Sequence, residues 1–380
     1  MCIRDRYKTA KPLIDSGKLT MLGVVQEQHA ERAQLYKQWK QYDFPIVQDA
    51  TTSLNLAVVP VPLFVDEYGI IRNSRPRPND LGKFVAQTFE DDASNEKTDQ
   101  PNESSDVEKL IAKGNTLLHD VAKRDVEQAI EVLSKAVEAH PKNSKAKFSL
   151  GVAMRMRFDS KGAHNGDFAT AAKLWAEALA MNPNQYIWRR RIEQYGPRLG
   201  KPYPFYNWVD NAIADIKKRG EEPVELTVNF TGTELAGPVR KFDVESGDKN
   251  PDPQSQIVLA GDELVQLSPS VVRAAVQPSS VVRVHLNLKP INCKWNDEAG
   301  PLMVWVDESS DGSPQKRLLE FPLAESQSPE QTRNIDFEFK AKGDSAQSSV
   351  TGFALFHICD DDGVCVYKRK DFEINIGGSK

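Results

Sequence analysis

One spacing pattern occurs twice in the middle of the chain, and it restricts the fold more than any other feature of the sequence. Each copy has an alanine, a large apolar residue four positions later, a second alanine after three more, and a proline after five more. The two copies lie 42 residues apart and consist of Ala129, Leu133, Ala136 and Pro141, and of Ala171, Trp175, Ala178 and Pro183. Residues three and four apart share one face of a helix. The small residues therefore let two helices approach closely, the large residue fills the gap between them, and the proline ends the helix. The repeat predicts helical hairpins over residues 107–220.

The regions on either side of the repeat have different patterns, so the chain is expected to be multidomain. Residues 7–90 alternate helix and strand signals, which is typical of an α/β fold. Residues 91–106 contain no large apolar residue and are predicted to be a disordered, solvated linker. Residues 221–380 contain alternating and β-branched runs separated by turns, which predict an all-β sandwich. We expect residues 1–6 to be a non-native stub, so that the native N-terminus, with any signal peptide, is missing.

Composition excludes several classes of function. The 380 residues carry a net charge of −5, whereas binding to nucleic acid phosphates needs a basic field. No stretch approaches ~18 apolar residues, so no transmembrane helix is expected in this fragment. The chain has no glycine-rich phosphate loop, no HExxH pattern and no serine nucleophile elbow. We therefore expect no cofactor, and no partner that is a nucleic acid.

The N-terminal region contains a motif with the sequence VPVPLFVDEYG. Pro60, Asp66 and Gly69 have the spacing in which a Val-Pro pair precedes an apolar strand and a turn. In this motif the region resembles the thioredoxin superfamily, in the style of redoxins and thiol-specific antioxidant proteins. The resemblance implies a cis Val59–Pro60 bond beside a redox site, with Pro60 as its proline. It also implies catalytic cysteines at the start of the helix whose tail is residues 7–16, at positions expected to precede the native sequence; Cys2 falls near that place but within the expected stub. The alternative is that Pro60 is an ordinary turn proline.

The helical region resembles tetratricopeptide repeats, because both quartets occupy that family's alanine, large-apolar, alanine and proline positions. The second copy departs from the family pattern by a glycine-rich loop over 161–167. The resemblance implies that a peptide or a protein partner binds the concave face of the array. The alternative is a spacer that packs the flanking domains together. Arg189, Arg190 and Arg191 could form an anion site, but we expect them to lie on a solvated helix face.

The sharpest local signal lies near the C-terminus, where Cys359 and Cys365 flank a short loop containing Asp-Gly. An Asp-Gly pair marks a hairpin turn, and cysteines facing each other across a hairpin come within the ~4–7 Å Cα separation that a disulfide needs. Together with the predicted sandwich, this hairpin resembles the N-terminal periplasmic domain of the transmembrane thiol-disulfide reductant transporter. That resemblance implies an immunoglobulin-like sandwich with a redox-active pair. His357 is expected on the same side of the strand as Cys359, where a protonated imidazole would lower the thiol pKa; the alternative is that it is an ordinary surface residue of the strand.

The cysteine pair has three interpretations that the sequence leaves open. It is a structural disulfide that pins the hairpin, a redox-active pair that exchanges with a thioredoxin-like partner, or a metal pair. The last is disfavoured because no set of Cys and His residues completes four ligands. The remaining cysteine outside the stub, Cys293, is expected to be a buried or loop thiol. Together these patterns predict a periplasmic or secreted, redoxin-like protein that acts in thiol-disulfide exchange or antioxidant chemistry, with Cys359 and Cys365 as the only candidate catalytic residues present. The alternative is a non-enzymatic scaffold that binds partners through its repeats.

Overall fold

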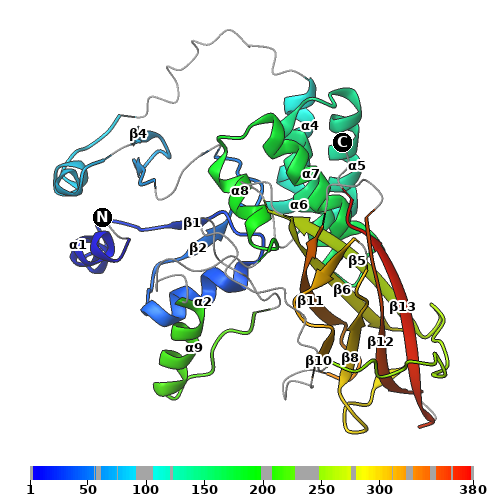
Figure 1. The fold of residues 1–380 in the computed structure, drawn as a ribbon. Helices are drawn as coiled ribbons and strands as arrows, with labels where there is room; N and C mark the ends of the chain where they lie inside the picture. Colours follow the sequence, from blue (N-terminus) through cyan, green and yellow to red (C-terminus); the bar gives the residue numbers. More distant parts are fainter. Residues whose placement is uncertain are drawn as a thin grey trace. The chain divides into compact units, whose positions relative to one another are not determined.

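The computed structural model describes residues 3–54, 56, 61–74, 76–90, 106–119, 123–197, 208–226, 248–274, 280–309, 311–321, 328–342, 348–360 and 363–377. The chain divides into two compact units, which we describe separately (Figure 1). The helix-rich unit comprises residues 1–156, 177–188 and 207–229, and the strand-rich unit comprises 157–176, 189–206 and 230–380. The predicted linker lies outside the described residues except for Asp106, and Val59 and Pro60 lie outside them as well.

The first part of the helix-rich unit alternates helices with short strands, as its sequence predicts. Its elements are α1 (Ile3–Asp15), β1 (Gly23–Val25), α2 (Ala30–Lys40), β2 (Ile46–Gln48), β3 (Phe64–Val65), β4 (Ile71–Asn73), a 3₁₀ turn (Pro78–Asp80) and α3 (Leu81–Val85). Strands β1 and β2 are parallel and are joined through α2, whereas β3 and β4 form an antiparallel hairpin. Each strand is two or three residues long and pairs with a single neighbour, so the described strands form two small sheets and not one continuous sheet.

The turn between β3 and β4 explains the Asp66 and Gly69 positions of the motif. The Asp66 carboxylate accepts hydrogen bonds from the backbone N–H groups of Tyr68 and Ile70, both at 2.9 Å. Gly69 has a φ of 84°, a left-handed conformation that glycine adopts without steric cost. These two residues therefore shape a tight turn.

The predicted repeat region is helical, and its first two helices, α4 (Asp106–His119) and α5 (Val126–Ala139), pack together as a hairpin (Figure 1). The helices that follow are α6 (Ser144–Phe158), α7 (Asp167–Met181), α8 (Tyr186–Glu193) and α9 (Trp208–Lys218). Pro141 follows the end of α5 and Pro183 follows the end of α7, as predicted, and a proline there cannot continue the helix. The glycine-rich loop connects α6 to α7, at the place where the sequence predicts an insertion. None of the described helices is both long enough and apolar enough to cross a membrane.

Packing within the first hairpin shows why the small residues are needed. A Cβ atom placed on Gly114 of α4 would lie 2.5 Å from Cγ of Leu133 on α5, which is closer than real Cβ contacts. Leu133 is fully buried, as are Ala129 and Ala136 on the same helix. The glycine thus opens the space that the leucine fills, and the two helices approach closely along this seam.

The strand-rich unit contains two antiparallel sheets that share one core. Its strands are β5 (Val265–Arg273), β6 (Val281–Pro290), β7 (Lys294–Trp295), β8 (Leu302–Val306), β9 (Gly312–Pro314), β10 (Leu318–Phe321), β11 (Arg333–Ala341), β12 (Ser349–Cys359) and β13 (Cys365–Asn375). One sheet has the order β5-β6-β11-β9 and the other β10-β8-β12-β13, with β7 also paired to β12. Apolar side chains from both sheets, such as Leu286, Phe339 and Phe356, belong to a single buried cluster. The predicted β-rich C-terminal region is therefore confirmed.

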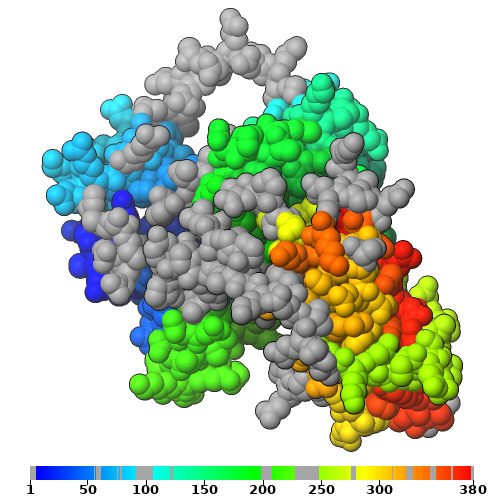
Figure 2. All heavy atoms as spheres, in the orientation of Figure 1, coloured from blue at the N-terminus to red at the C-terminus, as the bar shows by residue number. Residues whose placement is uncertain are grey.

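A non-strand segment partly covers the outer edge of β13. The Ala260 N–H donates to the Arg369 carbonyl at 2.7 Å, and the Arg369 N–H donates to the Val258 carbonyl at 3.0 Å. The Arg369 guanidinium donates to the Asp252 carboxylate at 2.8 Å. Burial alone would raise the pKa of Asp252, but hydrogen bonds from Arg369 and from backbone N–H groups lower that pKa overall. Figure 2 shows the two segments touching, yellow-green against red, at the lower right of the view.

The start of the region predicted to be an all-β sandwich has no strand in its described part. Residues 224–226 have no regular secondary structure, and residues 227–247 lie outside the described residues. The Val224 N–H donates to the side chain of Gln38 at 3.0 Å, and the Val224 side chain packs with α2 and α9. The apolar side chain of Val224 therefore packs against helices, and Val224 does not pair in a strand.

Candidate functional site

Cys359 and Cys365 form a disulfide at the end of a long two-stranded ladder. Cys359 is the last residue of β12 and lies directly opposite Cys365, the first residue of β13. The connecting loop is ordered at its ends by Asp360, whose carboxylate accepts the Val364 N–H at 2.8 Å, and by Gly363, whose φ is 80°. The predicted hairpin and its disulfide are thus confirmed, whereas the choice between a structural and a redox role stays open.

The two sulfur-bearing residues differ in their accessibility. Cys365 is exposed, whereas Cys359 is half-buried. Strand β13 stands at the edge of its sheet, and the segment that covers it reaches Arg369 but pairs with no described residue nearer the disulfide. A thiol approaching from solvent therefore reaches Cys365 more easily than Cys359.

An aromatic pair lies next to the disulfide. His357 on β12 is opposite Tyr367 on β13, and their rings stack with centroids 4.3 Å apart. Because His357 and Tyr367 each lie two residues from a cysteine, they share its face of the sheet. The Nδ1 atom of His357 is buried and has no hydrogen-bond partner among the described residues. The disulfide thus has a titratable ring beside it.

Cys293 is buried, as the sequence predicts, and is not part of this site. Its Sγ donates a hydrogen bond to the Leu264 carbonyl at 3.2 Å. Burial raises the pKa of this thiol, so its reactive thiolate is scarce at neutral pH. In the described part of the chain, no three His, Cys, Asp or Glu side chains gather closely enough to hold a metal ion.

A second candidate site, absent from the sequence analysis, is a polar cavity in the helix-rich unit. Its volume is about 350 Å³. Helices α4, α6 and α8 line it together with the segment 49–54 that follows β2. Its lining residues are Thr51, Thr52, Ser53, Glu108, Ile111, Ala112, Asn115, Thr116, His119, Lys145, Ser149 and Trp188. Hydroxyl groups dominate this list, so the cavity is suited to polar contents.

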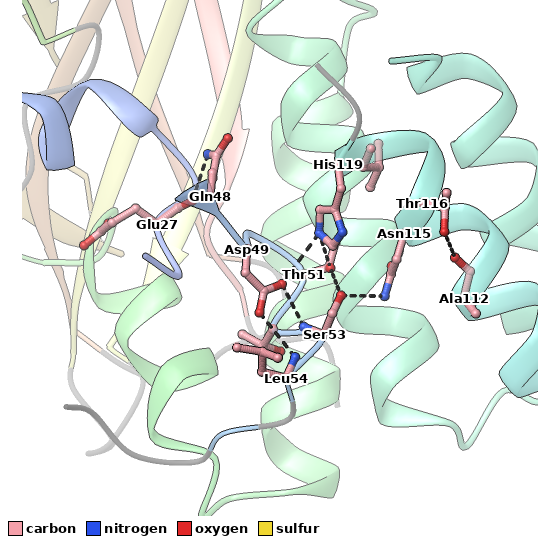
Figure 3. A network of polar contacts seen from close by, with 12 residues as sticks. Glu27, Gln48, Asp49, Thr51, Ser53, Leu54, Ala112, Asn115, Thr116 and His119 are labelled. Atoms are coloured by element: carbon pink, nitrogen blue, oxygen red, sulfur yellow. Dashed lines mark hydrogen bonds and ion pairs between the residues drawn. The ribbon is translucent and has the colours of Figure 1, made fainter. Parts of the chain in front are cut away.

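Segment 49–54 reaches this cavity through side-chain contacts with the helices. Figure 3 shows Thr51 and Ser53 pointing toward His119 and Asn115 of α4. Thr51 Oγ1 lies 2.9 Å from His119 Nε2. Asn115 Nδ2 is 3.5 Å from Ser53 Oγ, at the limit of a weak hydrogen bond. Helix α4 thus contacts another segment of the same chain.

The turn of segment 49–54 is held by its first residue. The Asp49 carboxylate accepts the backbone N–H of Ser53 at 2.8 Å and that of Leu54 at 3.3 Å. At the far side, Trp188 Nε1 donates to Thr52 Oγ1 at 3.2 Å. A polar run directly after a strand is the signal that could have located this segment in the sequence, although its hydrogen-bonded helix partners lie 62 residues or more away along the chain.

One expectation about charged residues is wrong. Arg191, expected on a solvated helix face, is only 1% exposed, and its guanidinium carbon lies 5.6 Å from the centroid of the Trp175 ring. His29 also has polar neighbours in the sequence, but it is 5% exposed and lies directly before α2, with its Nδ1 3.7 Å from a Glu31 carboxylate oxygen. In both cases tertiary packing overrides the polar sequence context.

The contact between His119 and segment 49–54 is expected to weaken in acid. Burial lowers the pKa of His119 and Arg124 adds to the effect, while Asp49 opposes it. The unfolded chain, in which histidine titrates near 6.5, therefore binds the proton more readily than the folded chain. This stabilisation is complete above about pH 6.5 and is lost as the pH falls through the lowered pKa.

Urea unfolding of the wild type and of His119→Gln at pH 8 and pH 5.5 measures this effect. The wild type is expected to lose more stability than the variant over this interval. The other histidines are common to both proteins, so they cancel in the comparison. Equal losses in the two proteins would show that His119 does not contribute.

No protein-family model matches this chain, and no curated protein matches it. The functional argument therefore depends on the chemistry of the two candidate sites.

Proposed function

We propose that this protein is an extracytoplasmic thiol-disulfide exchange protein, in which the Cys359–Cys365 disulfide is the bond that exchanges. The observation that carries the proposal is the position of this bond: it lies at the loop end of an edge hairpin, where Cys365 is exposed and no described strand pairs with its outer edge. An accessible disulfide is the kind that takes part in exchange, whereas structural ones are typically buried or resistant to reduction.

Three features of the described chain support finer assignments that belong to this proposal. The parallel β1–α2–β2 unit and the β3–β4 turn with Asp66 and Gly69 fit a thioredoxin-like segment. The seam of small residues and the proline-terminated hairpins fit tetratricopeptide-like repeats. The two antiparallel sheets around one core fit an immunoglobulin-like sandwich. A disulfide also fits a periplasmic or secreted location, because disulfides persist in oxidising compartments.

The exchange chemistry needs only the two cysteines and a dithiol partner. A partner thiolate attacks one sulfur of the disulfide and forms a mixed disulfide, while the other sulfur leaves as a thiolate. The partner's second thiol then attacks the partner sulfur of the mixed disulfide. This step forms the partner's disulfide and releases the reduced protein. Two electrons and two protons pass from the partner to this chain. A thioredoxin-like protein carries the dithiol that this reaction requires.

A redox titration of the full chain tests the proposal. The protein is equilibrated in buffers of defined potential, and free thiols are alkylated and counted by mass spectrometry. We expect the pair to titrate near about −200 mV with fast exchange, because exchange-active disulfides are more oxidising than structural ones. Cys293→Ser serves as the control, since it leaves the pair as the only described thiols.

A second function is favoured by the contact between segment 49–54 and the helical array. The hydrogen bonds of Thr51 with His119 and of Thr52 with Trp188 support a helical region that binds polypeptide segments, as in a non-enzymatic scaffold whose disulfide only holds the hairpin. In the redox titration such a pair would stay oxidised below about −300 mV. That outcome would replace the exchange function with the scaffold function.

A further inference from the structure

Among the described residues, the disulfide has two basic side chains beside it on its own face of the sheet: His357 of β12, and Lys294 of β7, which lies directly opposite Cys359 and 3.3 Å from a Glu330 carboxylate oxygen. His357 precedes Cys359 by two residues on β12, and Tyr367 follows Cys365 by two residues on β13. Positions two apart on a strand point to the same face and lie about 7 Å apart along it. The disulfide and the His357–Tyr367 pair are therefore neighbouring cross-strand pairs on the same face of the sheet.

The imidazole of His357 is held between two surfaces. The Tyr367 ring stacks on it at an interplanar angle of 27°. A Cβ atom placed on Gly300 would lie 3.4 Å from Cε1 of His357, so the backbone of residue 300 passes close to the ring. The buried Nδ1 makes no hydrogen bond to any described residue. The ring is thus restrained, and its Nδ1 is not committed to a structural hydrogen bond.

The asymmetry of the disulfide determines which sulfur needs a proton. An incoming thiolate reaches the exposed Cys365, so the electron pair of the breaking S–S bond leaves on the half-buried Cys359. A thiolate in a half-buried position is poorly solvated, and its formation is costly unless a proton or a positive charge is near. His357 is the titratable side chain on the same strand and face as Cys359.

We propose that His357 is the proton donor to Cys359 when the disulfide opens, a role that rests on the proposed exchange function. The reductant thiolate bonds to Sγ of Cys365, the S–S bond breaks, and Sγ of Cys359 takes the proton of the His357 imidazolium. The second thiol of the reductant loses its proton to solvent and attacks the reductant's own sulfur. Cys365 then leaves as a thiolate and is protonated by solvent, while His357 regains its proton from solvent.

The pH dependence of reduction tests this role. Dithiothreitol reduces the full chain under quenched-flow conditions from pH 5.5 to pH 9, and each rate is divided by the concentration of dithiothreitol thiolate. For the wild type, this thiolate-specific rate constant is expected to rise about a hundredfold as the pH falls, which is the low end of general-acid effects. For His357→Gln it is expected to stay flat, and the two proteins are expected to agree at pH 9.

His164→Gln is the matched control, because it removes an exposed histidine from the loop between α6 and α7. It is expected to behave as the wild type at every pH. A flat wild-type profile would overturn the role of His357 even if the variant failed to fold, and so would a rise that persists in His357→Gln. Rapid reduction with a flat profile would leave the exchange function standing, whereas a wild-type disulfide that resists dithiothreitol would overturn both.

Discussion

Replacing Gly352 with alanine is expected to lower the free energy of unfolding of the strand-rich unit by about 3 kcal/mol or more. Gly352 lies in β12, opposite Phe372 of β13 and Val306 of β8. A Cβ atom there would lie 2.2 Å from the backbone oxygen of Trp305 and 2.6 Å from Cζ of Phe372. A backbone oxygen inside a sheet cannot move aside without breaking the ladder, so the clash has to distort the strand.

Hydrogen exchange of peptides from β12 and β13 as a function of urea measures this loss locally. A local probe is needed because a chain with two units need not unfold in a single transition. Gly82→Ala is the control, since a Cβ atom at Gly82 meets nothing within 4 Å and the residue lies in a helix. That variant is expected to be neutral or slightly stabilised. Normal protection of β12 in Gly352→Ala would contradict the expectation.

Replacing Trp175 with alanine is expected to cost about 3–5 kcal/mol, because the change leaves a large cavity in a packed interior. Trp175 is fully buried, and its ring stacks on that of Tyr195 with centroids 5.8 Å apart. The Arg191 guanidinium lies over the Trp175 ring, 5.6 Å from its centroid, and would lose this aromatic neighbour. Loss of helical circular dichroism at a lower urea concentration than in the wild type is the expected measurement.

Trp175→Phe separates packing from hydrogen bonding at the same position. The indole Nε1 is buried without a hydrogen-bond partner among the described residues, so phenylalanine removes no visible hydrogen bond and leaves a smaller cavity. We expect it to cost much less than alanine. If phenylalanine and alanine were equally harmful, the large-apolar position of the repeat would have a role other than filling space.

The repeat was predictable because its signal is local and physical. A large residue four positions after one alanine and three before another defines a seam on one helix, and the structure confirms that Leu133 fills the space left by Gly114. The hairpin at Cys359 and Cys365 was predictable for a similar reason, since Asp-Gly between two apolar runs specifies a turn and the turn fixes the register of the ladder.

Other features depend on contacts between distant parts of the chain, which a single sequence does not reveal. Strand β5 contains Pro269 and was not predicted; it pairs on one side only, as an edge strand, where a proline is tolerated. Arg191 and His29 have polar neighbours in the sequence, yet both are buried.

The docking of segment 49–54 on the helical array has a consequence for competition. A molecule that binds the helix surface around His119 and Trp188 must displace segment 49–54. Because this segment is covalently attached, its effective concentration is of the order of millimolar. The apparent affinity falls in proportion to the fraction of molecules in which the segment has left, so an undocked population of about 1% weakens binding about a hundredfold. Thr51 and Thr52 hold the segment to His119 and Trp188. Substitution of either threonine would thus strengthen the binding of such a molecule, although the helix residues that it contacts are unchanged.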